Sequence, residues 1–158
     1  MKVEWLILGD YAQVVEGKLY LMGGGWSTLT INTSFPAKYM LGIAASVIVP
    51  WNETNQKTQI EIEVLTDDGG SLGKGGGEFT VGRPPAHPPG QDQRMQFAAN
   101  VGVELKNPGT YSIVGRLEGQ EDARIQFNVV PGPALAMKQK YSGKEPKSTE
   151  ESDGEESS

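Results

Sequence analysis

The sequence predicts an all-β protein, an antiparallel β-sandwich of immunoglobulin-like or jelly-roll type with eight or nine strands. Three observations predict this class. Apolar and polar residues alternate over many short segments, turn residues separate these segments, and no window repeats its apolar residues every 3.6 positions as an amphipathic helix does. Since no helical crossover is available to connect parallel strands, the strands are expected to be antiparallel. A closed barrel is the alternative, because the pattern indicates which faces are buried but not the strand order.

The N-terminal part of the chain begins with a nearly continuous apolar run over residues 3–9, as in a strand that is covered on both faces. A tight hairpin is expected next, with Gly17 supplying the positive φ that its turn requires. The second arm of this hairpin runs to Leu21. Glycines 23–25 then interrupt the sheet, and residues 26–31 resume it.

The middle of the chain predicts two strands and a glycine-rich loop. Residues 41–49 are apolar at every odd position and mostly small at the even ones. One face of this strand is therefore expected in the core, and the other is left for the close approach of another segment. Residues 60–64 alternate apolar side chains with glutamates, as in a half-buried strand. Residues 67–77 contain six glycines and are expected to form a mobile loop.

The C-terminal part of the body predicts a brief strand at residues 78–81 and a long one at residues 95–105. Asn107-Pro108-Gly109 forms the next turn, because proline presets φ and glycine accepts a positive φ. A terminal hairpin then pairs residues 111–117 with residues 123–129.

A change in composition after residue 130 predicts the domain boundary. Residues 1–130 are expected to form the sandwich, and residues 131–158 a disordered tail, because Pro131-Gly132-Pro133 cannot continue a strand. Residues 148–158 carry five acidic side chains and neither basic nor apolar ones. A turn of helix at residues 134–140 is an alternative for part of the tail, although seven residues are too few to be stable alone.

Composition excludes several classes of chemistry. The 158 residues contain no cysteine and one histidine, which excludes thiol catalysis, cysteine-based zinc sites and iron–sulfur clusters. A net charge of −6 argues against nucleic acid and anionic membranes as partners. No apolar run approaches the roughly 18 to 20 residues that span a bilayer, and Glu4 interrupts the stretch that would otherwise resemble a signal peptide. We therefore expect a cytoplasmic protein with no cofactor and no metal.

The loop around Trp51 is one candidate binding site. An indole ring can stack on the face of a sugar while neighbouring amide and carboxylate groups bind its hydroxyls. The alternative is that the tryptophan only caps the end of the hydrophobic core. The candidate residues are Trp51, Asn52, Glu53 and Asn55.

The proline-rich segment at residues 83–90 is a second candidate. Four prolines favour an extended polyproline II path that presents His87, the only histidine. With Arg83, Asp92 and Arg94 close in sequence, His87 is a candidate for contacting a protein partner or an anion. The favoured alternative is a stiff crossover between two sheets with a solvated histidine.

Paired carboxylates give a weaker indication of catalysis. Glu61 and Glu63 lie about 6 to 7 Å apart on one face of a predicted strand, a spacing that invites a comparison with glycosidases. Alternating glutamates also describe an ordinary solvated sheet face, and two-carboxylate catalysts hold their acids across a cleft. A hydrolase using this pair or the Asp92 loop therefore ranks last.

Several motifs together resemble a known family. They are residues 3–12, Val-Glu-Trp-Leu-Ile-Leu-Gly-Asp-Tyr-Ala; Trp51-Asn52-Glu53-Thr54-Asn55; the run from Gly82 to Arg94 with its Arg-Pro-Pro and Pro-Pro-Gly-Gln-Asp-Gln-Arg segments; and Pro108-Gly109-Thr110-Tyr111. The resemblance is to a family of small bacterial proteins defined only as a domain of unknown function, and it spans the body but not the tail. It implies a bacterial or phage origin and assigns no catalytic residue.

The sequence therefore favours a non-enzymatic module for protein interaction or structural support. Its partner is expected to be another protein or a second copy of the chain, bound through a loop end or an open sheet edge, and a homodimer formed through a sheet edge fits this pattern. A small-ligand or carbohydrate-binding sandwich that uses the Trp51 loop is the alternative.

Overall fold

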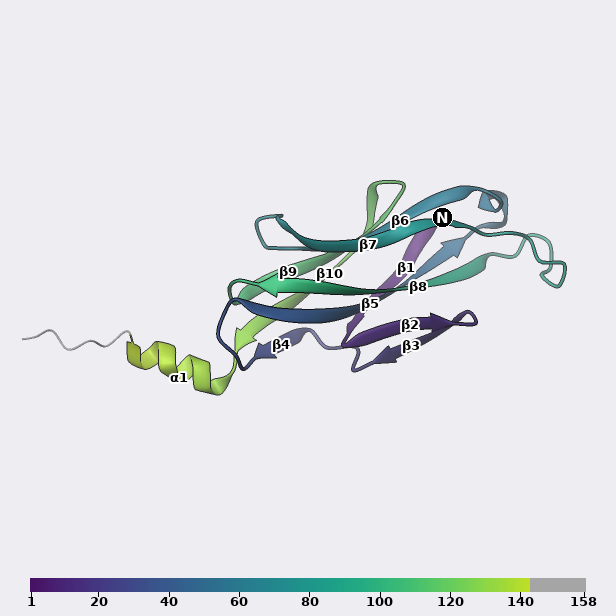
Figure 1. The fold of residues 1–158 in the computed structure, drawn as a ribbon. Coiled ribbons are helices and arrows are strands. Elements are labelled where there is room, and N and C mark those ends of the chain that lie inside the picture. Colours follow the sequence, from purple (N-terminus) through teal and green to yellow (C-terminus); the bar gives the residue numbers. More distant parts are fainter. Residues whose placement is uncertain (143–158) are drawn as a thin grey trace, which may run out of the picture.

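The computed structural model describes residues 1–142, and these residues form ten β-strands, one short 3-10 helix and one α-helix (Figure 1). The predicted all-β class is confirmed, with ten strands in this part of the chain in place of eight or nine. In chain order the elements are β1 (Lys2–Gly9), β2 (Tyr11–Val15), β3 (Lys18–Met22), β4 (Thr28–Ile31), β5 (Ala37–Val49), η1 (Trp51–Glu53), β6 (Lys57–Leu65), β7 (Ser71–Thr80), β8 (Gln93–Leu105), β9 (Gly109–Leu117), β10 (Gln120–Pro131) and α1 (Pro133–Ser142).

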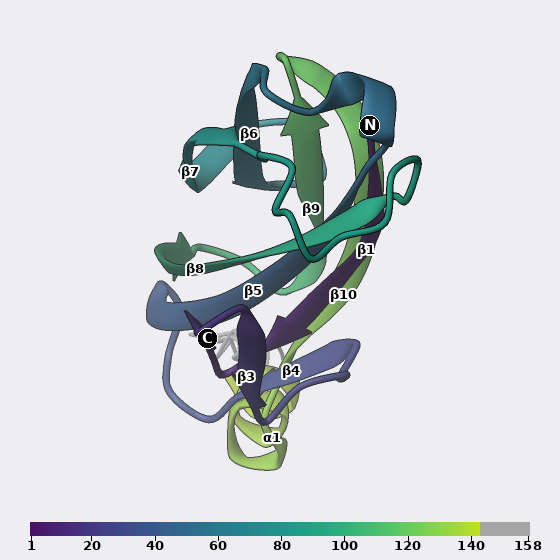
Figure 2. The same cartoon turned by 90° about the vertical axis from the view of Figure 1, so that its right-hand side faces the viewer.

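The strands form two large sheets and a separate hairpin. One large sheet has the order β1-β5-β8 and the other the order β4-β10-β9-β6-β7, while β2 pairs only with β3. Every pairing is antiparallel except that of β4 with β10, which is parallel. The five-stranded sheet curls like half of a barrel, and the three-stranded sheet lies across its concave side (Figure 2).

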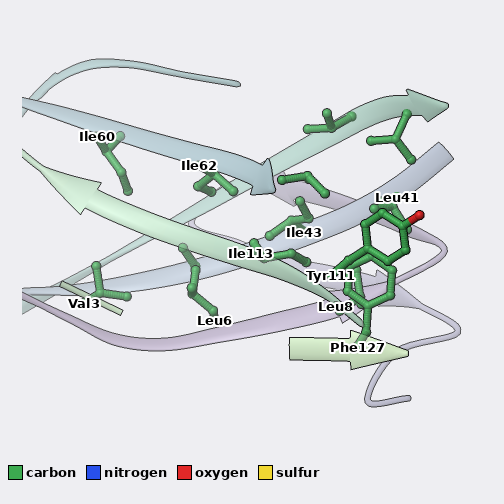
Figure 3. Packing of buried hydrophobic residues seen from close by; sticks show 14 of the residues in the cluster. Val3, Leu6, Leu8, Leu41, Ile43, Ile60, Ile62, Tyr111, Ile113 and Phe127 are labelled. Atoms are coloured by element: carbon green, nitrogen blue, oxygen red, sulfur yellow. The ribbon is translucent and has the colours of Figure 1, made fainter. Parts of the chain in front are cut away.

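Both large sheets contribute to one hydrophobic core (Figure 3). The odd positions of β5 from Leu41 to Val49 are all fully buried, as the alternation predicts. Ile60, Ile62 and Val64 of β6 are buried from the opposite sheet, while the glutamates between them are turned away from the core. The period-2 pattern therefore placed the inward faces of these two strands correctly, because these apolar positions leave water for the core that the two sheets share.

An aromatic group closes one end of the core. The rings of Tyr111 and Phe127 stack with centroids 5.6 Å apart, and Trp26 meets Phe127 edge to face at 6.0 Å. The Tyr111 hydroxyl donates a hydrogen bond to the carbonyl oxygen of Asn107 at 2.5 Å. This bond ties the turn between β8 and β9 to the start of β9, so the ring is fixed at both of its ends.

The glycine-rich segment differs from its prediction, because residues 71–80 form strand β7 and only residues 66–70 form a turn. The glycines allow a close approach on both sides of this strand. A side chain at Gly73 would meet the Val101 side chain of β8 at 2.8 Å, and one at Gly76 would meet the carbonyl oxygen of Ile60 at 2.1 Å. Glycine therefore permits the edge of the five-stranded sheet to lie against β8 of the other sheet.

The segment after residue 130 also differs from its prediction over the part that the structure describes. Pro131 is the last residue of β10, and Pro133–Ser142 forms helix α1 where a disordered tail was expected. The amide of Ala136 donates to the carbonyl of Gly132 at 2.9 Å, so the helix starts directly from the sheet. The acidic residues 148–158 lie outside the described residues.

We predict that Gly76→Ala lowers the free energy of unfolding by about 1 to 3 kcal/mol, because the new methyl group overlaps backbone that cannot move freely. Gly77 is the matched control, since nothing lies within 4 Å of a side chain there. Gly77→Ala should leave stability unchanged or raise it slightly by restricting the unfolded chain. Urea unfolding of both variants measures the difference, and equal losses would contradict the close packing of β7.

Candidate functional site

The structure brings Trp51 and Arg83 together. The Arg83 guanidinium lies 4.3 Å from the centroid of the indole ring, a distance typical of a cation–π contact. Arg83 also donates from Nη2 to the Trp51 carbonyl at 2.8 Å and from Nε to the Thr54 hydroxyl at 2.6 Å. The buried Thr54 hydroxyl in turn donates to the Trp51 carbonyl at 2.8 Å. One face of the indole is therefore occupied by a side chain of the protein itself.

The other predicted residues of this loop point in different directions. Asn52 and Asn55 are exposed, and the Asn55 amide donates to the Val81 carbonyl at 2.7 Å. Glu53 is half-buried and pairs with the N-terminal amino group of Met1. These contacts tie the loop to β7 and to the N-terminus, and the predicted sugar-binding role of its residues stays a prediction.

The proline-rich segment connects β7 of one large sheet to β8 of the other. It is folded into turns where an extended path was expected, because the His87 amide donates to the Pro84 carbonyl at 3.0 Å and the Gln91 amide to the Pro88 carbonyl at 3.3 Å. His87 and Asp92 are both exposed. A role for either side chain in binding stays a prediction.

Arg94 does not join Arg83 and His87. It lies on β8 and holds Glu4 of β1 in a two-point ion pair, with N–O distances of 2.6 and 2.7 Å. The Ser46 hydroxyl donates to the same carboxylate at 3.0 Å. Arg94 lowers the pKa of Glu4 through these hydrogen bonds. The pair spans the three-stranded sheet, since Ser46 belongs to β5 between the other two strands.

Glu61 and Glu63 share one cationic partner on the outer face of the five-stranded sheet. Arg116 donates from Nη1 to both carboxylates at 2.9 Å, and the Ser71 hydroxyl donates to Glu63 at 2.9 Å. The Ser71 hydrogen bond and the Arg116 guanidinium together hold the pKa of the Glu63 carboxyl below its usual range. A general acid needs the opposite shift, so this arrangement suits a structural ion pair better than catalysis.

Within residues 1–142, no three histidine, aspartate or glutamate side chains converge as metal ligands would. The α-helix of this region is also too short and too polar to span a membrane.

The predicted hairpin β2–β3 is confirmed with its turn at Gly17, where φ is 73°, but the predicted site residues did not include any of it. It lies across the outer face of the three-stranded sheet, where the small even positions of β5 leave room for it, as the alternation predicted (Figure 1). The backbone of Tyr11 passes so close to Gly42 that a side chain at Gly42 would meet it at 2.6 Å. Asn100 of β8 fixes the hairpin from the side, because its amide oxygen accepts from the Ala12 amide at 3.0 Å and its nitrogen donates to the Ala12 carbonyl at 2.9 Å.

The hairpin has two apolar faces. Its inner face carries Ala12, Val14, Leu19 and Leu21, which are buried or half-buried. Its outer face, which we call the hairpin face, carries large apolar side chains that are between 42 and 65% exposed. These are Tyr11, Val15, Tyr20 and Met22.

The apolar surface extends from the hairpin onto the sheet beneath it. Met40 is 54% exposed and lies two residues before Gly42 on the same face of β5. Next to Met40 is an apolar groove of about 540 Å³, which Leu72, Gly102 and Val103 help to line. The signal for this surface was present in the sequence, since apolar residues occupy both odd and even positions of residues 11–22 and a surface hairpin can bury only one of its faces. Gln13 and Lys18 also lie on the outer face.

Comparison with protein families gives one match, the family of unknown function DUF6941, over residues 4–130. The chain belongs to this family. The matched region of this DUF6941 member runs from β1 to β10 and includes the hairpin, the Trp51 loop and the proline-rich segment, so the predicted resemblance to a family of unknown function is confirmed. Comparison with curated proteins finds no match.

The Glu63 carboxylate predicts a dependence of stability on pH. Its pKa is depressed in the folded state, so it contributes stability that is complete above the ordinary glutamate pKa, about 4.3, and is lost as the pH falls through the lower folded value. We predict that Glu63→Gln destabilises the protein at neutral pH and that the difference from the parent protein shrinks below about pH 4. Urea unfolding at several pH values measures this.

Glu104→Gln is the control, because Glu104 is an exposed carboxylate on β8. It should behave like the parent protein at every pH. A loss for Glu63→Gln that stays constant from neutral to acidic pH would show that the charge of Glu63 is not what stabilises the fold.

Proposed function

We propose that this chain is a non-enzymatic protein-interaction module that binds its partner through the hairpin face. The observation that carries the proposal is the concentration of exposed apolar side chains on one small element. Of the eight large hydrophobic residues that are exposed between residues 1 and 142, four lie on the hairpin and Met40 lies on β5, while the other three are Val130 of β10 and Met137 and Tyr141 of α1. Exposing such a cluster to water is unfavourable in free energy, and contiguous apolar patches on a protein surface are typical of interaction sites.

The residue types support the same proposal. Tyrosine and methionine are enriched at protein interfaces, because they offer large apolar contact areas that tolerate different partners. Gly42 and Asn100 hold the hairpin on the sheet before any partner arrives. Little conformational entropy is therefore lost on binding, which favours affinity.

The scaffold that we infer is an immunoglobulin-like sandwich. In that fold one sheet contains strands A, B and E, and the other contains G, F, C and C′ in this spatial order. The orders β1-β5-β8 and β10-β9-β6-β7 fit this scheme. Tyr111 supports it further, since its hydroxyl reaches back to a backbone carbonyl four residues upstream, as a tyrosine corner does. The hairpin β2–β3 is then an insertion after the first strand.

The polar clusters favour binding over catalysis. Glu61 and Glu63 are both paired with Arg116, and the lowered pKa of Glu63 is opposite to the shift that a general acid needs. Arg83 covers one face of Trp51, which reduces the surface available for stacking on a sugar. Carbohydrate binding by this loop is the second candidate, and a cytoplasmic location remains an expectation.

Affinity capture with the full chain as bait tests the proposed function. The double variant Tyr20→Ser and Met22→Ser removes apolar area from the hairpin face, and we expect it to lose the partner that the parent protein captures. The matched control is Met137→Ser with Tyr141→Ser on α1. The side chains in both pairs are exposed, by 55 and 65% on the hairpin and by 64 and 78% on the helix.

The control variant should capture as the parent protein does. Equal capture by the hairpin variant would place the binding site elsewhere on the chain. Specific retention of a glycan by the parent protein, lost in Trp51→Ala, would favour the second candidate.

A further inference from the structure

We propose that the partner at the hairpin is a second copy of this chain, joined by antiparallel pairing of β3 with β3 around a two-fold axis at Tyr20. This inference rests on the proposed function and names its partner.

The turn of the hairpin determines which backbone groups face outward. Glu16 and Gly17 both have positive φ, 50° and 73°, as in a two-residue type I′ turn. Such a turn is closed by a hydrogen-bonded pair, here Val15 and Lys18, and hydrogen-bonded pairs then alternate along the strands. Lys18, Tyr20 and Met22 therefore direct their backbone groups toward β2, and Leu19 and Leu21 direct theirs away from it.

The contact of Asn100 with Ala12 agrees with this direction. Ala12 pairs with Leu21, and its amide and carbonyl both point away from β3 to the Asn100 side chain. The opposite edge of the hairpin has no equivalent cap. Between residues 1 and 142, no group forms a hydrogen bond with the outward amides and carbonyls of Leu19 and Leu21.

The edge of β3 is complementary to itself. Antiparallel pairing about Tyr20 places Leu19 of one copy opposite Leu21 of the other, and these are the two residues whose backbone groups face outward. Each such pair exchanges two hydrogen bonds, so the two symmetric pairs form four. An off-centre register would leave some of these groups unpaired.

The side chains fit the same register. On the inner face leucine meets leucine, and on the hairpin face Tyr20 meets its symmetry mate, a type of cross-strand pair that stabilises sheets. Lys18 lies opposite Met22, so no like charges face each other across the axis. The result is a four-stranded sheet whose outer surface joins the two hairpin faces.

The longest of the other strand edges, that of β8, is less suited to this pairing. The long edge of β8 is covered by β7, which comes close to Val101 and to the carbonyl oxygen of Gly102. Proteins protect exposed edges with charges, prolines or bulges. Among the five residues of β3, only Lys18 at its first position is charged. An unprotected edge with exposed apolar neighbours is a template for strand pairing.

Sedimentation equilibrium of the full chain over a wide concentration range tests the proposal. The parent protein should show a reversible shift from the mass of one chain to that of two. Tyr20→Lys places two like charges at the axis, and Leu19→Pro removes two of the four hydrogen bonds without removing one within the hairpin. Each variant should weaken the dimer about tenfold or more.

Tyr141→Lys is the matched control, because it makes the same change at an exposed tyrosine on α1. It should dimerise like the parent protein. Circular dichroism checks that the Leu19→Pro variant keeps its strands. If that variant unfolds, Tyr20→Lys still tests the proposal, because the Tyr20 side chain is 55% exposed and its replacement does not disturb the core.

Two results would overturn the proposal. One is a parent protein that stays monomeric at every concentration, and the other is a dimer that Tyr20→Lys leaves unchanged. The first result, combined with capture of a different protein that depends on Tyr20 and Met22, would refute self-association while supporting the proposed function.

Discussion

The position of the hairpin β2–β3 depends on one close contact between backbones. The backbone of Tyr11 crosses Gly42 of β5 at a distance that admits no side chain. The side-chain amide of Asn100, on the neighbouring strand β8, completes the contact by pairing with the backbone of Ala12. Together these contacts turn one apolar face of the hairpin onto the three-stranded sheet. Because strand side chains alternate, the other apolar face must then point to solvent. The exposed surface on which the proposed function rests follows from this docking, and no separate feature is needed to explain it.

Glycine also allows a close approach between strands in β7. In β7, Gly73 and Gly76 allow the last strand of the curled sheet to lie against β8 and against the backbone of β6. This contact covers the long edge of β8, which would otherwise be open to pairing with other chains. Within residues 1–142, the long edge of β8 is therefore covered, while no hydrogen bond reaches the outward backbone groups of β3. That difference between the two edges is the basis for assigning self-association to the hairpin.

Much of the fold could be predicted from the sequence, because alternation reports directly on burial. Leu41, Ile43 and the other odd positions of β5 are buried as expected, and the small even positions do receive another segment. The glycine-rich first part of β7 could not be predicted, since its glycines resemble a flexible loop and only the partners on both sides explain them. The strand predicted from residue 78 is confirmed as the last part of β7. The candidate site was missed for a related reason. The residues with the most distinctive chemistry are engaged by other groups of the chain, since Trp51 contacts Arg83 and Arg94 is paired with Glu4.

Amide hydrogen exchange in dilute solution tests most directly whether the hairpin is docked on the sheet with the outer edge of β3 open, because it reports on each backbone amide of the hairpin separately. A hairpin docked by Asn100 with an open outer edge should protect the amide of Ala12 together with those of Lys18, Tyr20 and Met22. The amides of Leu19 and Leu21, which alternate with these protected residues along β3, should exchange rapidly with solvent. Protection of Leu19 and Leu21 equal to that of their neighbours in a monomeric sample would show that another part of the chain covers this edge. Rapid exchange at Ala12 would show that the hairpin is not docked on the sheet.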